Sequence, residues 1–203
     1  MLTDFEDVSP EAVAAWRQTG MAHDAAPVPQ RPQERQAWMR FKSQTLTRFT
    51  LDLRQAVQAI RGPQVKTARN LFALPILEPE SEAWFAQNLD DFLAAYDWTV
   101  PMAMPLMESV PIDASQAWLT RLVQAVARHP GALKKTIFEL QARDWNRRQQ
   151  NAIPDQQLAD WMRLLRLNGV KNYGYYPDDF INNQPDISRI RPQFSSWWYP
   201  DHD

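Results

Sequence analysis

The sequence predicts an α/β fold in which short apolar strands alternate with amphipathic helices along 203 residues. In four long stretches apolar residues recur at helical spacing, and each stretch precedes a short run typical of a strand. Strands separated by helices imply parallel pairing with crossover helices. The five glycines do not cluster after a strand, which disfavours an open sheet with a nucleotide-binding turn. The favoured architecture is therefore part of a (β/α)8, or TIM-type, barrel.

Start and stop signals set the expected boundaries of these elements. Ser9 is the expected N-cap of the first helix, and Asp113 that of a later one, where Gln116 would complete a capping box. Gly169 is expected to end the last helix. In chain order, helices are expected at 10–20, 32–60, 80–96, 113–128 and 154–167, and strands at 65–77, 98–107, 136–143 and 170–176.

The number of strands predicts half of a barrel. A complete barrel needs about 250 residues and eight strands, and four strand–helix units are expected here. Leu2-Thr3 would end a fifth strand, which would place Met1 inside a domain. We therefore expect residues 1–203 to form a single partial barrel domain, its C-terminal half. A half barrel leaves strand edges and an apolar inner face uncovered, which favours self-association.

Charge and composition argue against several classes of function. The formal net charge is −2 and no basic block is present, so a nucleic-acid partner is not expected. The chain has no cysteine and its three histidines lack metal-ligand spacing, so we expect no metal and no other cofactor. The N-terminus is acidic without an apolar segment, so the chain as given carries no signal peptide.

Acidic, amide and aromatic residues gather where a barrel carries its site, at the ends of strands and in the loops that follow. Rings can cover the apolar face of a sugar, while carboxylates accept hydrogen bonds from hydroxyls and pair with amines. This chemistry predicts a carbohydrate site, although Asp7 could instead be a helix cap. The candidates are Asp4, Glu6, Asp7, Arg69, Asn70, Trp98, Glu108, Glu139, Trp145, Tyr173, Tyr175 and Tyr176.

Three of these acids are the most informative. Glu139 lies within an apolar strand, where an unpaired carboxylate is costly to bury. It therefore has a functional role or forms an ion pair with Arg143 or Arg69. Asp4 and Glu6 are two residues apart after a strand, so both would point to the same side. Neighbouring like charges separate their pKa values, which suits an acid and a carboxylate in glycosidic cleavage.

Seven segments together resemble one protein family. They are Leu2-Thr-Asp-Phe-Glu-Asp, Arg40-Phe-Lys-Ser, Lys66-Thr-Ala-Arg-Asn, Tyr96-Asp-Trp-Thr, Met102-Ala-Met-Pro, Phe138-Glu-Leu-Gln and Asn168-Gly-Val-Lys-Asn-Tyr-Gly-Tyr-Tyr-Pro. They resemble the C-terminal glycoside hydrolase domain of the poly-β-1,6-N-acetyl-D-glucosamine N-deacetylases of biofilm-forming Gram-negative bacteria. The likeness runs from Leu2 to the end of the chain.

The resemblance implies a barrel that binds partially de-N-acetylated polymer in an electronegative groove and cleaves it. It would put Asp4 at the position of the acid linked to cleavage, with Glu6 beside it. Glu139, Tyr175 and Tyr176 would line the groove. The parent protein would lie in the periplasm, at the periplasmic face of the outer membrane, with an export porin as a partner.

Two departures from the family limit what this chain is expected to do. The family's deacetylase domain, which holds its metal, has no counterpart in this sequence, so deacetylation is not expected. The first barrel strands also have no counterpart, so part of the groove wall is missing. The alternative function is therefore a module that binds the polysaccharide without cleaving it.

Overall fold

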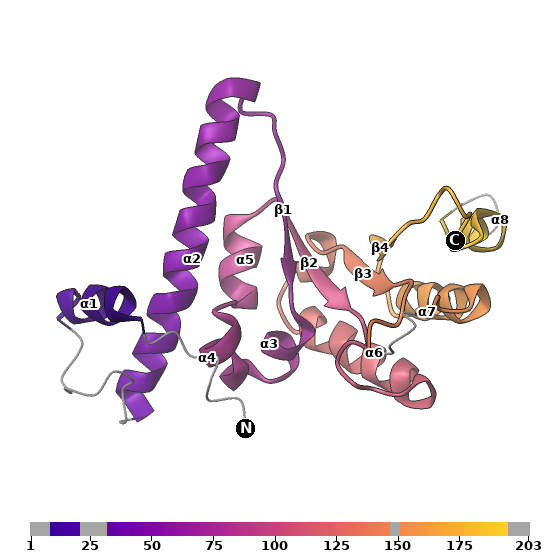
Figure 1. The fold of residues 1–203 in the computed structure, drawn as a ribbon, viewed down its shortest axis with the longest axis horizontal. Coiled ribbons are helices and arrows are strands. Elements are labelled where there is room, and N and C mark those ends of the chain that lie inside the picture. The colour runs from indigo at the N-terminus through magenta and orange to yellow at the C-terminus, as the bar shows by residue number, and fades with distance from the viewer. Residues whose placement is uncertain (1–8, 21–31, 147–150, 195–203) are drawn as a thin grey trace. The chain divides into compact units, whose positions relative to one another are not determined.

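The computed structural model describes residues 9–20, 32–146 and 151–194. The chain separates into two compact units that divide between Asp97 and Trp98. The first unit is mainly helical and the second alternates strands with helices, as the labels in Figure 1 show. The strand expected at Leu2-Thr3 lies outside the described residues. Within the described ranges, no helix is long and apolar enough to cross a membrane.

Two helices and a strand open the first unit. Helix α1 spans Pro10–Gln18, and the Ser9 side chain accepts a hydrogen bond from the Ala12 backbone N–H at 3.2 Å, which confirms the predicted cap. Helix α2 spans Pro32–Arg61. Strand β1 spans Ala68–Leu71 and is shorter than the expected strand at 65–77.

The single helix expected at 80–96 is wrong. Ala86 has a φ of 49°, a left-handed conformation that ends a helix, and it follows directly after Phe85. The Asn88 side chain then accepts a hydrogen bond from the Asp91 N–H at 3.1 Å and caps a new helix. The segment thus forms the end of the 3-10 turn η2 (Pro79–Ser81), α4 (Glu82–Phe85) and α5 (Leu89–Ala95). The helix before it, α3 (Ala73–Leu77), occupies the end of the expected strand at 65–77, so that part of the strand prediction is wrong.

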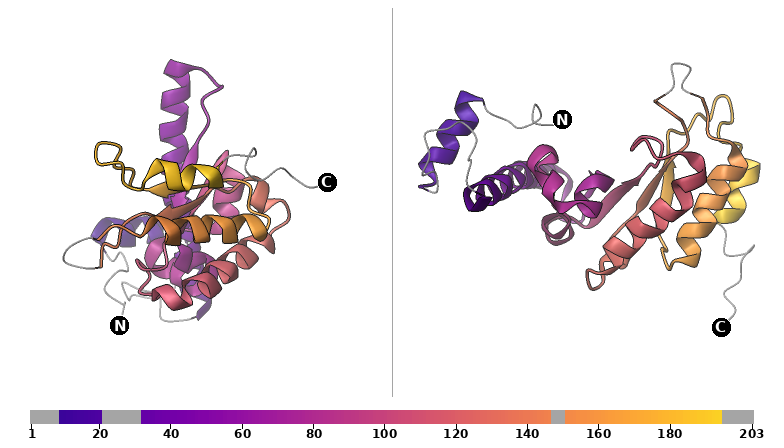
Figure 2. Two further views of the ribbon diagram at one scale, coloured as in Figure 1. Left: turned by 90° about the vertical axis from the view of Figure 1, so that its right-hand side faces the viewer. Right: turned by 90° about the horizontal axis from the view of Figure 1, so that it is seen from below.

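The second unit is a parallel sheet with crossover helices. Its strands pair in the order β2, β3, β4, all parallel, as predicted. Helix α7 packs against β3 and against α6, and Figure 2 shows these helices from two directions. In chain order the elements are β2 (Trp98–Ala103), α6 (Ile112–Ala127), the 3-10 turn η3 (Ala132–Lys134), β3 (Phe138–Gln141), α7 (Asp155–Leu167), β4 (Tyr173–Tyr176), α8 (Ile187–Ile190) and the 3-10 turn η4 (Arg191–Gln193).

The ends of α6 and α7 test two expected boundaries. Helix α6 begins at Ile112 after Pro111, with no side-chain cap, so the capping box expected at Asp113 is wrong. Asp113 lies instead in the first turn, where its charge favours the positive end of the helix dipole. Gly169, with a φ of 84°, follows α7 as predicted, because this left-handed conformation suits glycine.

Candidate functional site

The register of β3 and β4 divides the predicted site residues between two faces of the sheet. Residues paired across neighbouring parallel strands share a face, and consecutive residues along a strand alternate. One face is packed, because Phe138 and Leu140 on it are completely buried; Tyr173 and Tyr175 are in register with them. The opposite face, here called the Glu139 face, comprises Met102, Glu139, Gln141, Gly174 and Tyr176.

Tyr173 and Tyr175 hold the chain that follows α8. The Tyr173 hydroxyl donates a hydrogen bond to the Gln193 carbonyl, and its ring stacks on Phe194 with centroids 5.7 Å apart. The Tyr175 ring lies 6.2 Å from the same Phe194 ring, and its hydroxyl donates to Asp178 at 3.1 Å. Burial, together with the Asp178 carboxylate, raises the pKa of Tyr175. Both tyrosines are thus separated from Glu139 by the sheet.

Trp145 and Tyr176 form the aromatic part of the candidate site. Their rings stack with centroids 6.0 Å apart and planes 24° apart. We call this pair the ring platform. The Ala142 N–H donates to the Tyr176 carbonyl at 2.8 Å, so the segments that follow β3 and β4 start side by side. Tyr176 remains 57% exposed, which leaves a planar surface available to a ligand.

Gln141 positions the loop that follows β2. Its side-chain oxygen accepts hydrogen bonds from the backbone N–H groups of Leu106, at 2.8 Å, and Met107, at 3.3 Å. Its side-chain nitrogen donates to the Arg143 carbonyl at 2.8 Å. The completely buried amide therefore joins the Glu108 loop to the end of β3. Sequence reasoning did not assign this role, although a polar residue two positions after Glu139 was a signal for it.

A turn after β3 carries Trp145. The Asp144 carboxylate accepts a hydrogen bond from the Asn146 N–H at 3.0 Å, and the Asn146 side chain donates to the Leu106 carbonyl. The Asp144 N–H donates to the Asn151 carbonyl at 2.8 Å. Because the residues on both sides of Trp145 are anchored, the indole has a fixed base.

Glu139 lies half-buried in the middle of β3, in register with Gly174 on β4. A Cβ atom at Gly174 would meet no other atom within 4 Å, so the space there is open. Glu139 is two residues before Gln141, which is in register with Tyr176. Two residues of a strand span roughly 6.6 Å. This spacing suits one ligand that contacts both Glu139 and Tyr176.

The remaining predicted residues are divided between the two units and the part of the chain outside the described residues. Asp4, Glu6 and Asp7 lie outside the described residues. Asn70 is on β1 in the first unit, and Glu108 is in the loop after β2. Trp98 is the first residue of β2, at the opposite end of the sheet from the ring platform.

Arg69 is built into the first unit. Its guanidinium donates hydrogen bonds to the Thr50 hydroxyl at 2.6 Å and the Tyr96 hydroxyl at 3.1 Å. It also lies 5.0 Å from the centre of the Phe92 ring. These contacts link α2, β1 and α5, which is a structural role in this unit.

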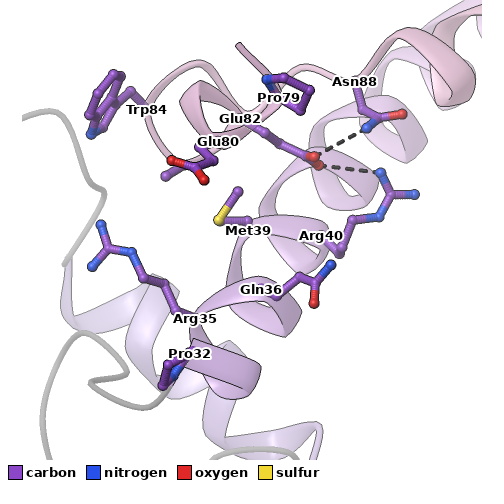
Figure 3. A pocket seen from close by; sticks show the side chains of 11 residues that line it. Pro32, Arg35, Gln36, Met39, Arg40, Pro79, Glu80, Glu82, Trp84 and Asn88 are labelled. Carbon is purple, nitrogen blue, oxygen red and sulfur yellow. Dashed lines mark hydrogen bonds and ion pairs between the residues drawn. The ribbon is translucent and has the colours of Figure 1, made fainter.

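A hollow of about 670 Å³ lies between α2 and the α4 region, and Figure 3 shows its lining. Arg40 bridges the carboxylates of Glu82, at 3.3 Å, and Asp91, at 2.9 Å. Burial opposes the charge of Arg40, but these carboxylates outweigh burial and raise its pKa. The Asn88 side chain donates to Glu82 at 3.1 Å. This network ties α2 to α4 and α5, which gives the polar lining a structural explanation.

Over 9–20, 32–146 and 151–194, no three side chains of His, Cys, Asp or Glu gather where they could hold a metal ion.

A family model described as "Hypothetical glycosyl hydrolase family 13" matches residues 1–176. The chain is 53% identical to the poly-beta-1,6-N-acetyl-D-glucosamine N-deacetylase of Escherichia coli K12, over 100% of this chain and 30% of that protein. The protein of the same name from Escherichia coli O157:H7 gives the same values. The chain thus spans less than a third of these relatives.

A solved structure gives the fold. The chain is similar to the PgaB (BpsB) glycoside hydrolase domain from Bordetella bronchiseptica, with a TM-score of 0.86 and 44% sequence identity. The match covers 93% of this chain and 52% of that chain. The predicted fold class, half of a TIM-type barrel, is confirmed.

Proposed function

Because the chain belongs to the family described as hypothetical glycosyl hydrolase family 13, we propose that it binds partially de-N-acetylated poly-β-1,6-N-acetyl-D-glucosamine. The predicted family resemblance is confirmed by these relatives, which are named for N-deacetylation of the acetylated polymer and for a glycoside hydrolase domain. They support a function connected with this polysaccharide.

The stacked pair of Trp145 and Tyr176, on the sheet face that also carries Glu139, is the observation that carries the proposal. A pyranose has an apolar face that packs on an aromatic ring, and its hydroxyls bond to polar groups beside it. De-N-acetylation exposes an amine that is protonated at neutral pH, and a carboxylate pairs with it. The ring platform would hold the sugar ring while Glu139 holds the amine.

Cleavage is proposed for the longer parent protein. There, Asp4 or Glu6 would donate a proton to the leaving oxygen or orient the neighbouring acetamido group. The acetamido oxygen would attack the anomeric carbon while the glycosidic bond breaks, and water would then open the cyclic intermediate. The proposal also places the parent protein at the periplasmic face of the outer membrane, where an export porin would receive the polymer.

The test measures binding and cleavage separately. The chain is incubated with partially de-N-acetylated polymer, and bound polymer and new reducing ends are both quantified. Binding that is lost in Trp145→Ala and retained in Phe49→Ala would support the site, since Phe49 is an exposed ring on α2. Absence of binding by the unaltered chain would refute the proposed function.

New reducing ends distinguish the enzyme from the alternative, a non-catalytic binding module. In a protein that contains the whole barrel, Asp4→Asn should abolish cleavage and leave binding nearly intact. Cleavage by Asp4→Asn at the unaltered rate would exclude Asp4 as the acid and leave Glu139 as the next candidate.

A further inference from the structure

The loop between β4 and α8 presents two apolar side chains to solvent. We call residues 177–186 the Phe180 loop. Phe180 and Ile181 at its tip are each 82% exposed. Leaving two large apolar side chains in water forgoes stabilisation that burial would supply. If the loop holds this apolar pair outward, the pair is a candidate binding surface.

The loop is closed by its own polar groups. The Asp179 N–H donates to the Gln184 carbonyl at 2.8 Å, and the Gln184 N–H donates to the Asp179 carbonyl at 3.0 Å. The Asp179 carboxylate also accepts hydrogen bonds from the backbone N–H of Asn182, at 3.1 Å, and its side chain, at 2.9 Å. None of these bonds involves the side chains of Phe180 or Ile181.

The base of the loop is anchored to α7 and to α8. The Asp186 N–H donates to the Asp155 carboxylate at the start of α7, at 3.1 Å. The Asn183 side chain donates to Asp186 at 3.1 Å and accepts from the Ile187 N–H at 3.2 Å. Asn183 has a φ of 49°, a conformation that asparagine tolerates better than most residues. The exposed pair is therefore held on a preorganised support.

The loop begins at the ring platform. Pro177 follows Tyr176 directly, so the loop leaves the same end of the sheet as the stacked rings. Asp178 and Asp179 lie between the platform and the tip, and hydrogen bonds from Asn182 lower the pKa of Asp179. The charge of Arg143, in the segment that follows β3, acts on Asp179 in the loop and helps to lower the pKa of its carboxylate. A ring next to carboxylates suits a sugar that carries an amine.

We propose that Phe180 and Ile181 form a second subsite for the amino-sugar polymer, beyond the one at the ring platform. This inference rests on the proposed function and extends it to a longer stretch of polymer. An anionic membrane surface is the less favourable occupant, because Asp178, Asp179 and Asp186 would repel it.

Oligosaccharides of different length test the proposal. Binding of the 203-residue chain to fully de-N-acetylated β-1,6-linked glucosamine disaccharide and hexasaccharide is measured by calorimetry. The double variant Phe180→Ala/Ile181→Ala should bind the hexasaccharide roughly 3- to 10-fold more weakly, the effect of losing one ring contact. Its disaccharide affinity should be unchanged, because a short ligand reaches only the platform. Phe180→Tyr should retain hexasaccharide binding.

The controls separate failure of this inference from failure of the proposed function. If the double variant binds the hexasaccharide as tightly as the unaltered chain, while Trp145→Ala does not, the second subsite is refuted and the platform stands. If the unaltered chain binds neither ligand, the proposed function fails and this inference fails with it. Binding to anionic phospholipid vesicles that requires Phe180, without hexasaccharide binding, would assign the loop to a membrane and refute the subsite.

Discussion

Trp145 lies in the segment that follows β3 and Tyr176 is the last residue of β4, yet their rings stack 6.0 Å apart at the carboxyl end of the sheet. The hydrogen bond from the Ala142 N–H to the Tyr176 carbonyl joins the start of that segment to the end of β4. The sheet register therefore brings the two rings together. Neither ring fills the core, since Tyr176 is largely exposed and Trp145 is half-buried.

Replacing Trp145 should weaken polymer binding without unfolding the chain. Trp145→Ala removes one of two stacked rings, and we expect about a tenfold loss of affinity, near the upper range for a ring contact. The thermal midpoint should change little, because Trp145 is half-buried in a loop. Calorimetry with the hexasaccharide and thermal unfolding check the two statements. Unchanged affinity would remove Trp145 from the site.

Gln141 should matter more for stability than its neighbours in the site. Gln141→Leu leaves the N–H groups of the half-buried Leu106 and Met107 without their side-chain acceptor, and an unsatisfied group costs about 1–3 kcal/mol when it is buried. Urea unfolding should show a loss of about that size. Gln116→Leu on the exposed face of α6 is the matched control and should have little effect. Equal effects of the two substitutions would contradict the assigned role.

The free energy of unfolding should fall in acid, because the ionised Asp97 carboxylate stabilises the fold. Its carboxylate accepts hydrogen bonds from the Thr67 N–H at 2.9 Å and from Lys66 at 3.2 Å. These bonds, that of Thr67 first, lower its pKa from 3.8 to about 2. Because the folded pKa is the lower one, the stabilisation is complete above pH 3.8 and disappears as the pH falls toward 2.

The matched substitutions test this dependence. Asp97→Asn should destabilise the chain at pH 7, and its difference from the unaltered chain should shrink between pH 4 and pH 2. The effect will be modest because the Asp97 side chain is 21% exposed and solvent screens the charge. Asp52→Asn on the exposed side of α2 is the matched control and should leave the stability at pH 7 almost unchanged. A constant difference down to pH 2 would refute the role of the Asp97 charge.

The sequence predicted the regular elements well and local breaks poorly. The long helix α2 and the strands β2 to β4 follow from apolar periodicity, which repeats over many residues. The break at Ala86 depends on one left-handed residue within an apolar stripe, and alanine gives no signal for that conformation. At α6, Pro111 preceded the helix and the start moved to Ile112, which placed Asp113 inside the first turn.

Only part of the candidate site could be predicted, because the sequence does not give the strand register or the contacts between distant residues. Alternation along a strand separates Tyr175 from Tyr176, but it does not tell which of them shares a face with Glu139. That assignment requires the register, in which Gly174 lies opposite Glu139. The contacts of Gln141 were equally inaccessible, because they join residues 35 positions apart in the chain.

Glu139 should recognise the amine of the polymer and not its general shape. Glu139→Gln keeps the size and hydrogen-bonding reach of the side chain but removes its charge. Affinity for the de-N-acetylated hexasaccharide should fall about 10-fold, the size of a charge-assisted hydrogen bond of about 1.5 kcal/mol. Affinity for the fully N-acetylated hexasaccharide should stay the same, since that ligand carries no cation.

Gly174 supplies an independent check on the same geometry. Gly174→Leu would put a side chain into the open space in register with Glu139, so the chain should fold while both hexasaccharides lose affinity. An equal loss for the two ligands in Glu139→Gln would show that Glu139 acts on a group common to both sugars. If neither substitution changes affinity for either ligand, the ligand does not bind on the Glu139 face, and the ring platform must bind it from another side.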